Sequence, residues 1–117
     1  MSELDKMFCP KSIAVIGASK NPKKIGYELV NNILAGGYEG RLYPVNPEGA
    51  DVMGLKSYTS VKLTPGEVDL AVIAVPAVYV PDIIEECGQK GIKSIIVISS
   101  FFKLCISNLL EARADDY

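Results

Sequence analysis

Histidine and tryptophan are both absent from this chain of 117 residues. Without histidine the chain has no imidazole base, no Ser-His-Asp triad and no phosphohistidine of its own. The three cysteines, Cys9, Cys87 and Cys105, form no closely spaced pair. This spacing favours reduced thiols over a disulfide framework and offers no metal-binding motif. We therefore predict that the chain contributes neither catalytic residues nor metal ligands.

Long hydrophobic runs and a strong charge of either sign are missing as well. The longest apolar run spans 71–80, contains Pro76 and falls far short of the roughly 20 residues that a membrane span needs. The amino-terminal sequence MSELDKMF lacks the basic-then-apolar order of a signal peptide. A net charge of −2 gives no strong basic face for a nucleic-acid duplex. We expect a soluble cytoplasmic protein that binds neither a membrane nor nucleic acid.

What the sequence does contain is a regular alternation of short apolar runs and helical patterns. With 49% hydrophobic and 22% charged residues, 1–117 suits a single domain. Continuous apolar runs, typical of strands covered on both faces, lie at 11–17, 41–45, 68–75 and 93–99. The alternation predicts an α/β fold, a Rossmann-like, doubly wound parallel sheet between two helical layers.

Two segments between these runs have the spacing of amphipathic helices. In 25–34 and again in 80–87, apolar residues recur three and four positions apart. Asn21 and Pro22 are the residue types of a helix N-cap and a first helical residue, so they predict where the first helix begins. The stretch 53–66 predicts a loop with one helical turn.

The pattern weakens after the fourth predicted strand. Residues 101–117 include apolar positions but show no clear period. An open sheet of four strands would leave one edge uncovered. We therefore expect either a chain truncated after this strand, with 101–117 as a divergent or truncated tail, or a sheet edge that a partner covers.

A candidate site follows the first strand. If the strand order is 2-1-3-4, the switch in order lies beside this strand, where ligands of doubly wound sheets bind. Gly17 permits a tight turn, Ser19 offers a hydroxyl, and a helix start presents free amides. Lys20, Lys23 and Lys24 crowd the same end, where cations oppose the helix dipole unless an anion binds. The pattern favours a phosphate-bearing ligand, and a merely solvated lysine surface is the alternative.

A dinucleotide is disfavoured as that ligand. The complete G-x-G-x-x-G pattern is absent, because serine stands at position 19 and the next glycine is Gly26. The acidic residue expected after the second strand is replaced by Asn46 and Pro47. An NAD(P)-type Rossmann domain stays open only as an alternative.

Four motifs occur in order along the chain: GASKNPKKIGY, YPVNP, DLAVIAVPA with VPDIIEECGQKG, and GIKSIIVIS. Together they resemble the CoA-binding domain of NDP-forming acyl-CoA synthetases, typified by ADP-forming acetyl-CoA synthetase and related to the succinyl-CoA synthetase α subunit. The resemblance covers about 4–100 and implies that the chain binds coenzyme A. The full enzyme would convert acyl-CoA, ADP and phosphate to the free acid, ATP and CoA.

The same resemblance implies which partners and residues take part. A histidine-bearing ligase domain and a nucleotide-grasp domain would carry the phosphoryl chemistry, and a homo-oligomer is left open. The implied cofactor-binding residues follow the four strands. They are Gly17, Ala18, Ser19, Lys20 and Lys24 at the first turn, Asn46 and Pro47 after the second strand, Val75 and Pro76 after the third, and Ile98, Ser99 and Ser100 after the fourth.

Two positions depart from the family's pattern. Glu48 stands where relatives often carry lysine, and Phe101 replaces a glycine. These departures keep open the alternative of a scaffold without a ligand. A separate alternative, which keeps the fold, is the non-catalytic synthetase-like regulatory region of a protein acyltransferase. On the second helix we interpret Glu85 and Glu86 as a solvated face and Cys87 as a small core residue.

Overall fold

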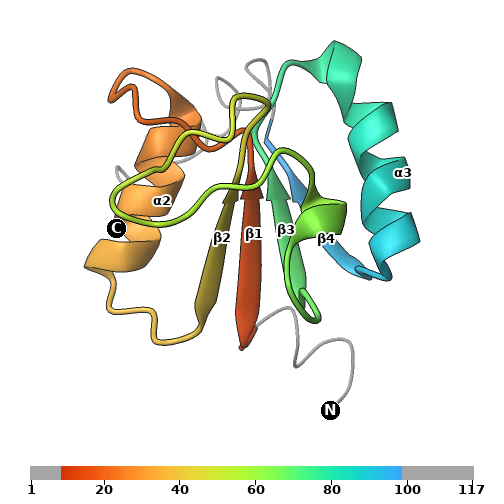
Figure 1. Cartoon of the computed structure of the whole chain (residues 1–117), viewed down its shortest axis with the longest axis horizontal. Helices are drawn as coiled ribbons and strands as arrows, with labels where there is room; N and C mark the ends of the chain where they lie inside the picture. Colours follow the sequence, from red (N-terminus) through yellow and green to blue (C-terminus); the bar gives the residue numbers. More distant parts are fainter. Residues whose placement is uncertain (1–8, 99–117) are drawn as a thin grey trace, which may run out of the picture.

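The computed structural model describes residues 9–98, whose arrangement Figure 1 shows. Four parallel strands form one sheet in the order β2-β1-β3-β4. They are β1 (Ser12–Ile16), β2 (Arg41–Val45), β3 (Leu70–Ile73) and β4 (Ser94–Val97). Helix α2 (Ile25–Ala35) covers one face of the sheet and helix α3 (Val80–Lys90) covers the other. The predicted three-layer, doubly wound fold is confirmed, and the switch in strand order lies between β1 and β3.

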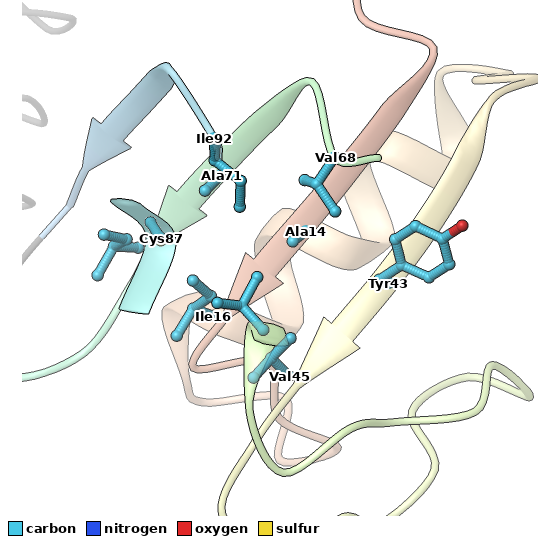
Figure 2. Close-up of a cluster of buried hydrophobic side chains, with 10 residues drawn as sticks. Ala14, Ile16, Tyr43, Val45, Val68, Ala71, Cys87 and Ile92 are labelled. Atoms are coloured by element: carbon cyan, nitrogen blue, oxygen red, sulfur yellow. The ribbon is translucent and has the colours of Figure 1, made fainter. Parts of the chain in front are cut away.

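The core consists of two apolar clusters, one on each face of the sheet. All five residues of β1 are buried because helices cover both of its faces. On the α3 face, the cluster in Figure 2 includes Ala14, Ile16, Val45, Ala71 and Cys87. On the α2 face, Ile13, Val15, Leu70 and Val72 of the strands pack with Val30 of the helix. The alternation of side chains along each strand therefore supplies both layers, and Cys87 is the small core residue that the pattern predicts.

Helix α2 begins later than the sequence predicts. Asn21 and Pro22 precede the helix instead of starting it, and the N-cap is Lys24, which makes no side-chain capping bond. The Asn21 side-chain oxygen accepts from the Lys23 amide at 3.0 Å, and its carbonyl accepts from the Lys24 amide at 3.0 Å. Asn21 therefore closes a turn of its own, which delays the helix until Ile25.

Helix α3 packs with a narrower apolar stripe than its spacing predicts. Ile83 and Cys87 face the sheet, whereas Ile84 is 41% exposed. The helix follows a 3-10 turn, η2 (Ala77–Tyr79), and ends at Gly91, whose φ is 90°. Of the helices in the described part of the chain, none is long and apolar enough to cross a membrane.

The long connection between β2 and β3 carries the predicted helical turn, η1 (Val61–Leu63). Three polar contacts fasten this segment to α3. The Ser60 hydroxyl donates to the Glu86 carboxylate, the Lys62 ammonium to the Gln89 side chain, and the Lys90 ammonium to the Thr64 carbonyl. The connection is therefore held against the helix that borders the switch in strand order.

Strand β4 is the least covered strand of the sheet. Its four residues are only half-buried, and within residues 9–98 no strand pairs with the edge that faces away from β3. The predicted tail 101–117, with Phe101, lies outside the described residues, as do Ser99 and Ser100 of the predicted site.

Candidate functional site

The site is built around the turn that follows β1. Gly17 has a φ of 95°, and a Cβ placed on it would lie 2.2 Å from the Ala74 carbonyl oxygen. Both features require glycine, because a side chain at this position would meet backbone and strain the turn. The Gly17 and Ala18 amides donate to the Val45 carbonyl at 2.8 and 3.2 Å. The turn is therefore clasped between the carboxyl ends of β2 and β3.

Gly26 is a further residue that this turn needs, and the sequence reading assigned it no role. It is buried in the first turn of α2, and a Cβ on it would lie 1.9 Å from the Gly17 carbonyl oxygen. The helix can approach the turn closely only because residue 26 has no side chain. Gly26 thus allows the helix to pack closely against the turn, as the third glycine of a dinucleotide motif does, although the full motif is absent.

Amides at this turn fall into two groups. The Gly17 and Ala18 amides both donate to the Val45 carbonyl and are not available to a ligand. The second group consists of amides that donate to no acceptor among residues 9–98. These are the amides of Ser19, Lys20, Ile25 and Gly26. Uncommitted amides at a helix start favour an anion, and the Ser19 hydroxyl oxygen lies beside them, accepting from the Asn21 amide at 3.0 Å.

The lysines at this turn face two different hollows. Lys20 lines one hollow together with Ser19, Pro47 and Glu48. Lys24 lines another, bounded by the loop after β3 and by Ile98. The structure therefore brings Lys24 to three other predicted site residues, Val75, Pro76 and Ile98. It does not gather Lys20 and Lys24 around one hollow, as an anion bound by both would require.

Asn46 acts within its own loop. Its side-chain nitrogen donates to the Ala50 carbonyl at 3.1 Å and to the Ser57 hydroxyl at 3.2 Å, and its side-chain oxygen accepts from the Ala50 amide at 3.2 Å. The adjacent Pro47 lines the Lys20 hollow and also a second, apolar pocket, which is described next. Asn46 therefore shapes the loop that presents Pro47.

A pocket of about 160 Å³ lies at the switch in strand order. Its walls are mostly apolar: Ile16, Val45, Val61, Val75 and Ile83. Its polar end is formed by Thr59, Ser60 and Glu86. A wider groove of about 570 Å³ continues along α3 past Tyr79 and Asp82. We call the smaller space the switch pocket.

The interpretation of Glu86 as part of a solvated face is wrong. Its neighbour Glu85 is exposed, as expected, but Glu86 is half-buried, lines the switch pocket and accepts a hydrogen bond from the Ser60 hydroxyl. The helical register held a signal, because Glu86 lies three residues after the inward-facing Ile83. Ser60 and Thr59 carried no such signal, since a long connection brings them to the pocket.

Thiols and carboxylates form no metal centre in the part of the chain that the structure describes, where no cluster of three potential ligands occurs. Burial raises the pKa of the Cys87 thiol to about 11, with a smaller contribution from the negative charge of Glu86. Cys87 is therefore protonated, and a poor nucleophile, near neutral pH. The exposed Cys9 lies before β1.

Comparison with known proteins matches most of the chain to one family. A family profile described as "CoA binding domain" covers residues 11–116. The α subunit of acetate–CoA ligase (ADP-forming) I from Pyrococcus furiosus is 52% identical over an alignment of 103 positions, which covers 85% of this chain and 22% of that protein. Acetate–CoA ligase (ADP-forming) II from Archaeoglobus fulgidus is 48% identical over 100 residues, or 86% of this chain and 15% of that protein.

A solved structure agrees with these sequence matches. Acetyl-coenzyme A synthetase 1 of Ca. Korarchaeum cryptofilum, in complex with phosphate and ADP, aligns with a TM-score of 0.80 and 46% identity. The alignment covers 83% of this chain and 21% of that chain. The chain thus spans only 15% to 22% of the length of these relatives.

Proposed function

The chain belongs to the CoA-binding domain family, and we propose that it binds coenzyme A across the first turn as the nucleotide-fold part of an ADP-forming acyl-CoA synthetase. The predicted family and its cofactor are confirmed by the family match. The synthetase activity is the activity named for its longer relatives. The observation that carries the proposal is the glycine turn with uncommitted amides beside an apolar pocket.

The residues around this turn fit the chemistry of coenzyme A. Its phosphates are anions and suit the uncommitted amides, which belong to the turn at Ser19 and Lys20 and to the start of α2 at Ile25 and Gly26. Its other parts are uncharged and suit the apolar walls of the switch pocket. The close packing of Gly17 and Gly26 brings the first turn and the start of α2 together at the point where the two environments meet.

The cofactor site we propose consists of the residues named from the resemblance, with roles assigned by their positions. Ser19 and Lys20 would contact one phosphate group of the cofactor and Lys24, which lines a different hollow, would contact another. Gly17 and Ala18 would form the turn between them. Pro47 and Val75 would pack against the uncharged part of the cofactor, since both line the switch pocket. Pro76 and Ile98 border the hollow that holds Lys24. Ser99 and Ser100 are retained as proposed contacts from the sequence alone.

Binding, and not bond making, is the role that we assign to this chain. A chain without histidine cannot carry a phosphohistidine. We propose that ligase and nucleotide-grasp domains or subunits supply that chemistry, as the small share of each relative that this chain covers suggests. We propose that the protein binds coenzyme A in the cytoplasm, where free thiols such as Cys9 and Cys87 persist in reduced form.

Calorimetric titration with CoA and with NADH tests the proposal. We expect CoA to bind and NADH to bind more weakly or not at all, because the chain lacks the acidic residue that holds a ribose diol directly after β2. Tighter binding of NADH would contradict the proposal. Absence of any heat with CoA would favour the scaffold alternative instead.

A further inference from the structure

The switch pocket is small for the ligand that the proposed function requires. Its volume of about 160 Å³ lies below the roughly 300–1,000 Å³ of ordinary ligand sites. Its walls come from strand ends, from α3 and from the connection between β2 and β3. The strands are held in place by their pairing within the sheet, and α3 is anchored in the core by Cys87. Admission of a larger group therefore requires the connection to move.

The part of the connection that can move is the segment 59–66, which we call the flap. Before it, the Tyr58 amide donates to the Pro44 carbonyl at 3.0 Å. After it, the Glu67 carbonyl accepts from the Ser12 hydroxyl at 2.9 Å. Between these two anchors, the backbone–backbone hydrogen bonds of 59–66 within the described structure all stay inside the flap. Segments without backbone bonds to the rest of a protein are the ones that open most easily.

The flap is an internally bonded unit. The Leu63 amide donates to the Ser60 carbonyl at 3.1 Å. The Thr64 amide and hydroxyl both donate to the Val61 carbonyl, at 3.2 and 2.6 Å. Thr59, Ser60 and Val61 of the flap line the switch pocket. A displacement of the flap as one body therefore changes the width of the pocket.

Three side-chain contacts fasten the flap to one face of α3. The contacting residues of the helix are Glu86, Gln89 and Lys90, whose spacing places them on the same face. Figure 1 shows η1, in green, beside this helix. The Lys90 ammonium donates to the Thr64 carbonyl in a partly buried contact. The Lys62 ammonium donates to the Gln89 side-chain oxygen at 3.0 Å in an exposed one.

On the premise of the proposed function, we propose that these contacts form an autoinhibitory latch, which holds the flap over the switch pocket until coenzyme A displaces it. The latch and the cofactor then compete. A protein whose binding-competent state is only partly populated binds its ligand more weakly in proportion to that fraction. Lys90 therefore lowers cofactor affinity although it does not line the pocket. A contact that merely supported the pocket wall would raise affinity instead.

Lys90→Met tests the latch, because methionine keeps an unbranched side chain of similar shape but has no donor for the Thr64 carbonyl. We expect calorimetry to give roughly three- to tenfold tighter binding of CoA. Urea denaturation should give a lower free energy of unfolding, because a partly buried contact is lost. A purely structural role cannot produce these two changes of opposite sign. Lys62→Met, which removes the exposed contact, should tighten CoA binding by a smaller factor.

Two further variants are controls. Lys90→Arg keeps a donor for the Thr64 carbonyl and should retain the wild-type affinity. Lys11→Met removes the same charge from an exposed residue before β1 and should not tighten binding. Loss of a positive charge by itself weakens the attraction of an anionic cofactor. Tighter binding by Lys90→Met therefore cannot result from the change in net charge.

The sign of the change in affinity decides the proposal. Weaker or unchanged CoA binding by Lys90→Met would overturn the latch and leave the proposed function intact. If Lys90→Met does not fold, Lys62→Met decides by the same criterion, since its contact is exposed. Only a wild-type chain that fails to bind CoA would remove the proposed function, and the latch with it.

Discussion

The two sides of the first turn differ in charge and in burial. On the α2 side, exposed lysines and uncommitted amides favour an anion. On the α3 side, buried aliphatic walls surround a single carboxylate, Glu86. One glycine turn therefore separates an environment for phosphate from one for a neutral donor. A ligand that has both kinds of group can bind in one direction only, so orientation follows from this difference.

The largest expected effect comes from a substitution that breaks the turn shared by both sides. Gly26→Val would drive a Cβ into the Gly17 carbonyl oxygen, which an ideal Cβ already approaches to 1.9 Å. Because the atoms that this Cβ would meet belong to the backbone and cannot move aside easily, we expect a loss of about 3 kcal/mol or more in the free energy of unfolding. Urea denaturation followed by circular dichroism measures this loss.

Gly88→Ala is the matched control for that substitution. Gly88 also lies in a helix, but a Cβ there would meet no atom within 4 Å in the described structure. Replacing this exposed glycine in the last turn of α3 by alanine should stabilise the chain by up to roughly 0.5–1 kcal/mol. Equal stability of the two variants would show that the contact between α2 and the turn is not tight.

The fold was predictable because its signals are local and repeated. The apolar run 41–45 coincides with β2, and the runs at 11–17 and 68–75 contain β1 and β3. The start of α2 was not predictable from Asn21 and Pro22. Their residue types suit a cap, but the hydroxyl of Ser19 and the backbone of the turn engage Asn21 first. A competing local structure therefore displaced the helix start.

The site was predictable in part, according to how each residue reaches it. Gly17, Pro47 and Val75 lie one or two residues beyond the ends of β1, β2 and β3, so topology alone places them together. Ser60 reaches the pocket through tertiary packing of η1 on α3, which no local pattern encodes. Glu86 differs from Glu85 by about 100° of helical rotation, so adjacent identical residues acquired opposite environments.

The next largest effect tests whether the α2 side of the turn binds phosphate through its lysines. Lys24→Ala should weaken CoA binding roughly tenfold, because a charge-assisted contact to phosphate is lost. The loss should shrink at high ionic strength, where exposed charges are screened. Calorimetry at two salt concentrations measures both quantities.

Lys11→Ala is the control for Lys24→Ala. Lys11 is also exposed but lies before β1, at the opposite end of the strand from the turn. Its removal changes the net charge equally and should leave CoA affinity unchanged. Equal weakening by both variants would indicate a general effect of net charge and contradict a local phosphate site beside α2.

A smaller effect is expected at Glu48, an acidic residue beside the proposed phosphate contacts. Glu48 lines the hollow that contains Ser19 and Lys20, where its charge opposes a bound phosphate. Glu48→Lys should therefore raise CoA affinity several-fold, a moderate change because the side chain is exposed and screened. Glu39→Lys reverses an equivalent exposed charge in the connection before β2 and should change little. Unchanged affinity in Glu48→Lys would place the phosphates outside this hollow.

The smallest effect is the one that the Glu86 charge has on the pKa of the Cys87 thiol, on the α3 side of the turn. The Cys87 pKa is raised to about 11, mainly by burial and secondarily by Glu86. The folded state therefore holds the thiol proton more tightly than the unfolded state, in which the thiol has its ordinary pKa of 9.0. This contribution to stability is complete below about pH 9 and is lost as pH rises towards 11.

Thiolate absorbance in a Cys9→Ser, Cys105→Ser background follows the titration of Cys87. Adding Glu86→Gln should lower the Cys87 pKa only slightly, because burial persists when the charge is removed. A large decrease would mean that the carboxylate, and not the apolar packing, dominates the α3 side of the site.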